Sequence, residues 1–298
     1  MNRFPVLLII LLAAYFGAST QSRNPELVVP HYAKVKAEAL ADSSGYEAHP
    51  YFILVDESEK ALAEGKYADA ALRLVEAMGI EPDNPLNVAL MSNLGMIYHY
   101  DGKDTLALQC LDEVVRRSPK LIAGHDNRAR VLAAIGRDKE AYEEFGRVIE
   151  LDSLNTDSRF YHGMMALYAG NLPVAERDFA VLEKVIPVSR NTYLAMGTLY
   201  ALTSREAQAQ SYLRKLVDIA PEVEYYLLLA DCYLVDGRLG EASDLLGKAL
   251  QRYPDDYSLY LRRARLNKAR YDSDAADRDV ETAINLGADP RIARSVLK

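Results

Sequence analysis

Small residues recur along this chain at a nearly constant spacing, which constrains the fold more than any single motif does. Seven alanines follow one another at intervals of 37, 34, 34, 34, 33 and 34 residues: Ala70, Ala107, Ala141, Ala175, Ala209, Ala242 and Ala276. Twelve positions before each alanine lies another small residue: Ser58, Gly95, Ala129, Gly163, Gly197, Ala230 and Ala264. A period of this length is typical of chains that stack one small structural unit many times.

Each unit is predicted to be a hairpin of two helices. In the second unit Met91, Leu94 and Tyr98 have helical spacing, and Leu111 is in step with Ala107. Five positions before each alanine, the residues are Gly65, Gly102, Gly136, Gly170, Ser204, Gly237 and Tyr271. Glycine suits a helix end that needs positive φ. We expect the two backbones to cross closely at the small residues, because larger side chains would overpack there.

A closing position completes the pattern twelve residues after each alanine, where proline is the commonest residue. Proline cannot continue a helix, so it separates one unit from the next. The pattern resembles the tetratricopeptide repeat, and Tyr193, Gly197, Tyr200, Ala209 and Pro221 match its signature well. The resemblance implies an all-α, right-handed superhelical solenoid of about seven helix–turn–helix repeats.

Seven units cover about four-fifths of the chain. They are assigned to residues 51–84, 88–121, 122–155, 156–189, 190–222, 223–256 and 257–290, with a short C-terminal capping helix at 291–298. The first unit has Glu57-Ser58 in place of Leu-Gly, and the last has Asn267 and Tyr271 in place of Tyr and Gly. Terminal repeats are expected to deviate, because one of their faces has no neighbouring repeat.

Residues 1–20 are predicted to be a secretory signal peptide. Arg3 precedes an apolar run from Val6 to Phe16, and the small residues 17–20 favour cleavage near Ser19 or Thr20. An uncleaved anchor is the alternative. No cysteine lies near this site, so a lipid anchor is not expected, and the chain has no Asn-x-Ser/Thr sequon. We therefore expect an exported protein in a bacterial periplasm or cell envelope, with secretion as the other possibility.

The segment 21–50 is predicted to be either a flexible linker or an N-terminal cap on the first repeat. Asn24-Pro25, Pro30 and Pro50 interrupt it, whereas Tyr32–Ala41 has the composition of one helix. The cap is the favoured interpretation.

Composition restricts the classes of function and partner. The formal net charge of −8 disfavours nucleic-acid binding. Cys110 and Cys232 are separated by four units, too far apart for a disulfide if the units stack regularly, so we expect two unpaired thiols. No histidine or cysteine pattern of a metal site occurs, and no nucleophile elbow or phosphate-binding loop. We therefore predict a protein that is not an enzyme and needs no cofactor or metal.

The resemblance also implies a ligand surface. In this family the second, fifth, sixth, ninth, twelfth and thirteenth positions of each first helix usually line the concave face; these are called the inner positions below. The partner-binding residues predicted in this way are Asn93, Met96, Tyr100, Asn127, Arg130, Phe160, Tyr161, Met164, Tyr168, Leu194 and Thr198. Packing between neighbouring first helices is the alternative role for these side chains.

Two inner features favour a peptide or protein partner. Asn93 and Asn127 share the sixth position, where stacked asparagines in related proteins hold a peptide backbone. The aromatic and methionine residues of the fourth unit suit apolar side chains. The resulting hypothesis is an exported interaction scaffold that helps to assemble an envelope complex. The alternative is a carbohydrate- or small-molecule-binding protein that uses the tyrosine-rich concave face.

A second candidate surface lies in the last unit. Residues 257–298 hold nine Lys or Arg against six Asp or Glu, and Arg262, Arg265 and Lys268 form a possible basic docking patch. The alternative is a solvated end of the repeat array.

Overall fold

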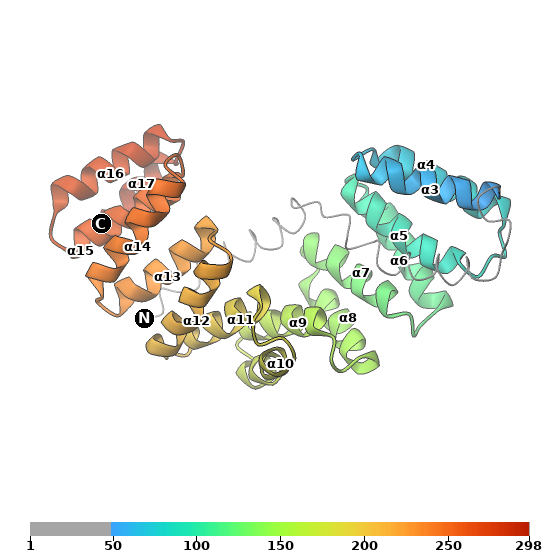
Figure 1. Ribbon diagram of the computed structural model, residues 1–298, viewed down its shortest axis with the longest axis horizontal. Helices are drawn as coiled ribbons and strands as arrows, with labels where there is room; N and C mark the ends of the chain where they lie inside the picture. Colours follow the sequence, from blue (N-terminus) through green and yellow to red (C-terminus); the bar gives the residue numbers. More distant parts are fainter. Residues whose placement is uncertain (1–48, 298) are drawn as a thin grey trace. The chain divides into compact units, whose positions relative to one another are not determined.

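The computed structural model describes residues 49–297, and every regular element within that range is a helix (Figure 1). The predicted signal peptide and nearly all of the segment 21–50 lie outside the described residues. The chain divides within helix α9 into two units, Met1–Met165 and Ala166–Lys298. Each unit is described by itself.

The first unit holds three successive helical hairpins and most of α9. Its helices are α3 (Pro50–Ala63), α4 (Tyr67–Ile80), α5 (Asn87–Tyr100), α6 (Asp104–Arg117), α7 (Ile122–Ala134), α8 (Asp138–Leu151) and α9 (Thr156–Tyr168). The two helices of each hairpin pack on each other, and α4 and α6 also pack on α5 and α7, the first helices of the next hairpins.

The second unit continues the same order of helices. It contains α10 (Leu172–Val185), α11 (Arg190–Leu202), α12 (Glu206–Ile219), α13 (Val223–Val235), α14 (Leu239–Arg252), α15 (Tyr257–Ala269), α16 (Ser273–Asn285) and α17 (Pro290–Ser295). The last of them, α17, begins at Pro290, one residue before the predicted capping segment 291–298. None of the described helices combines the length and hydrophobicity needed to cross a membrane.

The predicted close crossing is confirmed in the second and fifth hairpins. All seven periodic alanines are 0–1% exposed. A Cβ atom added to Gly95 would lie 2.7 Å from Leu111 Cγ, and one added to Gly197 would lie 2.6 Å from Leu213 Cδ2. Only a small residue fits there without moving the second helix.

The predicted turn position has positive φ in all seven hairpins, including the two that lack glycine. Ser204 has φ 55° and Tyr271 has φ 63°, close to the 72° of Gly65. The stacking of the hairpins therefore imposes this backbone conformation even where the side chain opposes it.

Candidate functional site

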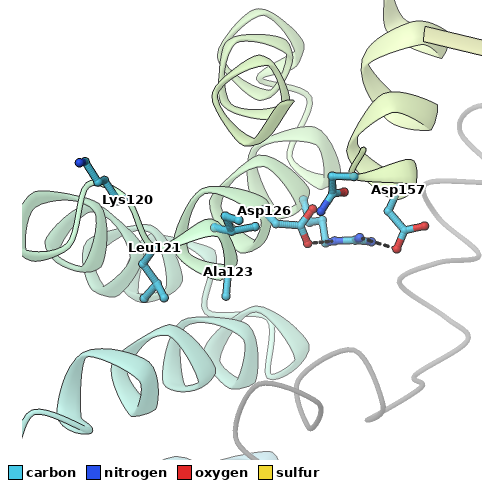
Figure 2. Close-up of a pocket in the computed structure, with 8 residues that line it drawn as sticks. Lys120, Leu121, Ala123, Asp126 and Asp157 are labelled. Atoms are coloured by element: carbon cyan, nitrogen blue, oxygen red, sulfur yellow. Dashed lines mark hydrogen bonds and ion pairs between the residues drawn. The ribbon is translucent and has the colours of Figure 1, made fainter. Parts of the chain in front are cut away.

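An open pocket of about 430 Å³ lies in the first unit, where α7 and α9 begin (Figure 2). Figure 2 shows Lys120 at one end and Asp157 at the other, with Leu121, Ala123 and Asp126 between them. The lining residues are Lys120, Leu121, Ile122, Ala123, Asp126, Arg130, Asn155 and Asp157.

Arg130 is held in one place by three neighbours. Its Nε donates to Asp126 Oδ2 at 2.7 Å, one helical turn away on α7. Its Nη2 lies 3.7 Å from Asp157 Oδ2, and its Nη1 donates to the Tyr161 hydroxyl at 3.3 Å. The guanidinium carbon lies 5.0 Å from the centroid of the Tyr161 ring, within reach of a cation–π interaction. The dashed lines in Figure 2 mark the two ion pairs.

The charges around Arg130 stabilise its cationic form. Burial lowers the pKa of the Arg130 guanidinium, but Asp126, Tyr161 and Asp157 together raise that pKa above its usual value. Burial also raises the pKa of Tyr100, where Arg130 acts in the opposite direction. The pocket wall thus presents a fixed, charged guanidinium, and the Tyr100 phenol that interacts with it stays neutral at physiological pH.

The far wall of the pocket is set by the start of α9. Asn155 Oδ1 accepts a hydrogen bond from the Ser158 backbone N–H at 3.0 Å, which fixes the first turn of the helix. The Ser158 hydroxyl in turn donates to Asp126 Oδ1 at 3.3 Å. At the opposite end, the exposed ammonium of Lys120 has no acidic partner among the described residues. Lys120 is therefore available to a ligand.

Of the inner residues predicted from sequence, most are buried and cannot contact a partner directly. These are Met96, Asn127, Phe160, Tyr161, Met164, Leu194 and Thr198, all at most 7% exposed. Phe160, for example, is 1% exposed and packs edge-on against Tyr161. The prediction of a ligand-facing cluster in the fourth repeat therefore needs correction, because these side chains pack within the protein. Asn93, Tyr100, Arg130 and Tyr168 remain half-buried.

The two asparagines of the sixth position are not equivalent. Asn127 is buried, and its side-chain amide donates to the Ser92 hydroxyl at 2.9 Å. Asn93 stays half-buried. Asn127 therefore links α7 to α5 and does not present a free amide to a peptide.

The predicted basic patch of the last repeat is only partly exposed, because Asp231 forms ion pairs with two of its arginines. Arg262 is 7% exposed, and its Nη1 lies 3.0 Å from Asp231 Oδ1, which Arg265 Nη1 also approaches at 3.1 Å. Burial lowers the pKa of Arg262 and raises that of Asp231. Arg262 therefore contributes to the interior of the second unit, whereas Lys268 and Arg265 remain exposed.

The other side chains that could bind a metal ion or react chemically pack within the protein or pair with a neighbour. No group of three His, Cys, Asp or Glu side chains suited to a metal ion occurs in the part of the chain that the structure describes. His125 Nδ1 lies 2.5 Å from Glu144 Oε2, and His162 stacks on Tyr142 with ring centroids 4.1 Å apart. Cys110 is half-buried and Cys232 is buried.

Sequence reasoning found Arg130 but missed the rest of the pocket. Ala123 and Asp126 stand at the second and fifth positions of the third repeat, and Asp157 stands at the second position of the fourth. The same positional rule therefore contained the signal for these three residues. Lys120 and Asn155 lie in the loops before the helices, where that rule says nothing.

Helical hairpins that repeat with a common crossing and a common turn define a helical-repeat protein. Comparison with known families identifies the type of repeat in part of the chain, because tetratricopeptide-repeat profiles match residues 191–222 and 223–266. These residues are similar to the tetratricopeptide repeat, and the described part of the chain has the tetratricopeptide-repeat fold. No match to it was found among curated proteins.

Solved structures share the fold. A tetratricopeptide-repeat protein from Parabacteroides merdae is 24% identical with a TM-score of 0.66, and the alignment covers 83% of this chain and 97% of that one. PilW, described as a widely conserved type IV pilus biogenesis factor, is 18% identical with a TM-score of 0.61, covering 71% and 98%. YrrB, described as having an unusual peptide-binding site, is 15% identical with a TM-score of 0.50, covering 64% and 98%.

Proposed function

We propose that this protein is a non-enzymatic interaction scaffold that binds an extended segment of a protein partner at the pocket beside Arg130. The observation that carries the proposal is the pocket itself, which opens at inner positions of the third and fourth repeats. Its charged wall is fixed by Asp126 and Tyr161 before any ligand arrives. Such preorganisation reduces the entropy cost of binding.

The pocket has the chemistry that a peptide requires. Leu121, Ile122 and Ala123 offer apolar surface for side chains, and they line the same space as the donors of Lys120 and Asn155. An extended peptide has backbone carbonyl groups that need such donors once water is displaced. Lys120 also favours a partner with an acidic residue near the contact.

The predicted signal peptide supports export, so we place the partner in a bacterial periplasm or cell envelope. The likeness of fold to PilW agrees with a role in assembling an envelope complex, and the likeness to YrrB agrees with peptide binding. The exposed positions offer no catalytic constellation in the described residues, which supports a binding role over an enzymatic one.

Charge reversal at the pocket tests the proposal. Tagged Lys120→Glu protein should recover at least about tenfold less of the partner from crosslinked envelope fractions than the unaltered protein does. Lys139→Glu is the matched control, because Lys139 is an exposed lysine on α8 that does not line the pocket. Equal losses in both variants would show only a general effect of charge, and no loss in either would remove the pocket from the proposal.

A carbohydrate ligand is the alternative function, and one contact favours it. The rings of Tyr67 and Tyr100 lie 5.9 Å apart, and Tyr100 is half-buried near Arg130. Aromatic rings beside polar groups are suited to sugar faces as well as to peptides. A glycan array probed with the purified protein distinguishes the two, since a strong hit that Tyr100→Ala abolishes would replace the peptide proposal.

A further inference from the structure

One histidine of the third repeat has a hydrogen-bond acceptor at each of its two ring nitrogens. His125 is 6% exposed, its Nδ1 lies 2.5 Å from Glu144 Oε2, and its Nε2 lies 3.1 Å from the backbone carbonyl oxygen of Pro119. A neutral imidazole carries a single N–H, whereas the cationic ring donates from both nitrogens. Only the cationic form of His125 therefore makes both hydrogen bonds.

Either neutral form of the ring would turn a nitrogen lone pair toward an oxygen lone pair inside the protein. A buried acceptor that faces another acceptor loses the hydrogen bond it would make in water. Protonation of Glu144 in place of the ring is opposed by Arg128, whose Nη1 donates to Glu144 Oε1 at 2.7 Å. The state that satisfies all of these groups is a charged imidazole between a carboxylate and a carbonyl group.

The charged groups around this ring come from three helices. Arg128, on α7, joins Glu144 on α8 to Asp112 on α6, since its Nε also donates to Asp112 Oδ1 at 2.7 Å. Hydrogen bonding to Arg137 lowers the pKa of Glu140, which is also on α8, and Arg128 acts in the same direction. In this network three carboxylates face two guanidinium groups, and a cationic ring balances their charge.

The bond to Pro119 fixes the start of the segment that carries Lys120. The Pro119 carbonyl and the Lys120 N–H belong to one planar peptide unit, so holding the carbonyl oxygen orients the backbone of Lys120. The Leu121 N–H closes the same turn with a 2.9 Å hydrogen bond to the Ser118 carbonyl oxygen. Lys120 and Leu121 both line the pocket. The geometry of one pocket wall is therefore tied to the proton on His125 Nε2.

Two other repeats make the same bond with donors that keep their protons. The fourth residue of the fourth repeat is Arg159, whose Nε donates to the Ser153 carbonyl oxygen at 2.7 Å. The fourth residue of the seventh repeat is Tyr260, whose hydroxyl donates to the Pro254 carbonyl oxygen at 2.9 Å. A guanidinium and a phenol stay protonated throughout the physiological range. Of these three bonds, that of the third repeat alone uses a side chain type that ordinarily titrates between pH 5 and 8.

We propose that His125 is a proton-dependent switch for the pocket, in which the cationic ring holds the Pro119 peptide and loss of one ring proton releases it. The remaining proton stays on Nδ1, because the bond to the Glu144 carboxylate is charge-assisted and the stronger of the two. Lys120 then loses its fixed position, so the partner should bind more tightly at pH 5.5 than at pH 8. This effect on binding rests on the proposed function of the pocket, whereas the switch itself does not.

Nuclear magnetic resonance on the full chain tests the switch without any partner. At pH 5.5 both ring nitrogens of His125 should carry hydrogen, and at pH 8 only Nδ1 should. The backbone order parameters of Lys120 and Leu121 should be about 0.85 at pH 5.5 and fall toward about 0.6 at pH 8. A ring with a single N–H at both pH values, or equal order parameters at both, would overturn the proposal.

Residues that occupy the same position in other repeats supply the matched variants. His125→Arg copies Arg159 and should keep the order parameter of Lys120 high at both pH values. His125→Met copies Met91 of the second repeat and should keep it low at both. His99→Asn is the control, because it alters a half-buried histidine of the second hairpin and should leave the pH response intact. A pH response that survives both substitutions of His125 would assign it to another group and overturn the proposal.

Recovery of the partner from crosslinked envelope fractions tests the effect on binding. The unaltered protein should recover about two- to tenfold more partner at pH 5.5 than at pH 8, the range expected from one hydrogen bond. His125→Arg should recover equal amounts at both pH values. Equal recovery by the unaltered protein would overturn the proposed regulation. Failure of the proposed function is distinguishable, because Lys120→Glu would then leave recovery unchanged while the order parameters still report the switch.

Discussion

The hydroxyl of Ser58 donates a 2.8 Å hydrogen bond to the backbone carbonyl oxygen of Ala70. These two residues mark the crossing of α3 and α4, where the other hairpins place glycine or alanine opposite the periodic alanine. Ser58 is 3% exposed and Ala70 is fully buried, so the bond is shielded from water. The first hairpin therefore has a buried polar link at its crossing, between the small residue of α3 and the periodic alanine of α4.

Replacing Ser58 with alanine should isolate the contribution of that bond. Alanine already occupies the equivalent position in three other repeats, so Ser58→Ala fits sterically. We expect the free energy of unfolding of the first hairpin to fall by about 0.5–1.5 kcal/mol. Urea denaturation combined with hydrogen exchange of α3 and α4 measures it, and an unchanged stability would contradict a role for the bond.

Adding one methyl group at a close crossing should have a larger effect. Gly197→Ala places a Cβ atom 2.6 Å from Leu213 Cδ2, and we expect a loss of about 1–3 kcal/mol. Gly247→Ala is the matched control, because Gly247 is inside α14 with nothing within 4 Å of an added Cβ. That control should stabilise by about 0.5–1 kcal/mol, since alanine is the better helix former. Equal effects of the two variants in thermal unfolding would contradict the proposed crossing.

Replacing the exposed Tyr271 should increase the stability of the last hairpin. Its side chain is 96% exposed and its φ of 63° is unfavourable for a residue with a Cβ atom. We expect Tyr271→Gly to stabilise the last hairpin by up to about 1 kcal/mol, because strain is relieved and no packing is lost. Gly237→Ala, at the equivalent turn with φ 71°, should do the reverse. Thermal unfolding by circular dichroism compares them, and a destabilised Tyr271→Gly would refute the argument.

The fold could be predicted from the sequence because each structural requirement recurs at the same position in several repeats. A single glycine such as Gly102 is a weak signal for a turn, but its recurrence at one spacing identifies the hairpin. The same repetition placed the last turn at Tyr271 despite its unsuitable side chain. A feature that occurs in one repeat only, such as the hydrogen bond of Ser58, cannot be predicted from the repeat pattern.

The site was less predictable because inner positions serve two purposes. Phe160 and Arg130 both stand at inner positions, yet Phe160 is buried and Arg130 lines the pocket. Which of them is covered depends on the size of side chains on neighbouring helices, and the period does not contain that information. Lys120 and Asn155 lie between repeats, where the pattern specifies almost nothing.

Thiol chemistry should separate the two cysteines. Burial raises the pKa of Cys232 to about 12, and it also raises the pKa of the half-buried Cys110. At pH 8 a thiol with such a pKa is ionised to about one part in ten thousand, so Cys232 should scarcely react with a disulfide reagent. Cys110 should react faster, and both should react rapidly in denaturant. Fast labelling of Cys232 in the folded protein would show that α13 opens readily.

Site-specific photo-crosslinking in cells tests the central claim most directly. A photoreactive amino acid at Ala123, in the pocket, should capture one protein partner, and Lys120→Glu in the same chain should abolish the adduct. The same probe at Ala180, an exposed position on α10 that is not among the lining residues, should capture none. Absence of an adduct at Ala123, or equal capture at both positions, would contradict recognition at the inner pocket.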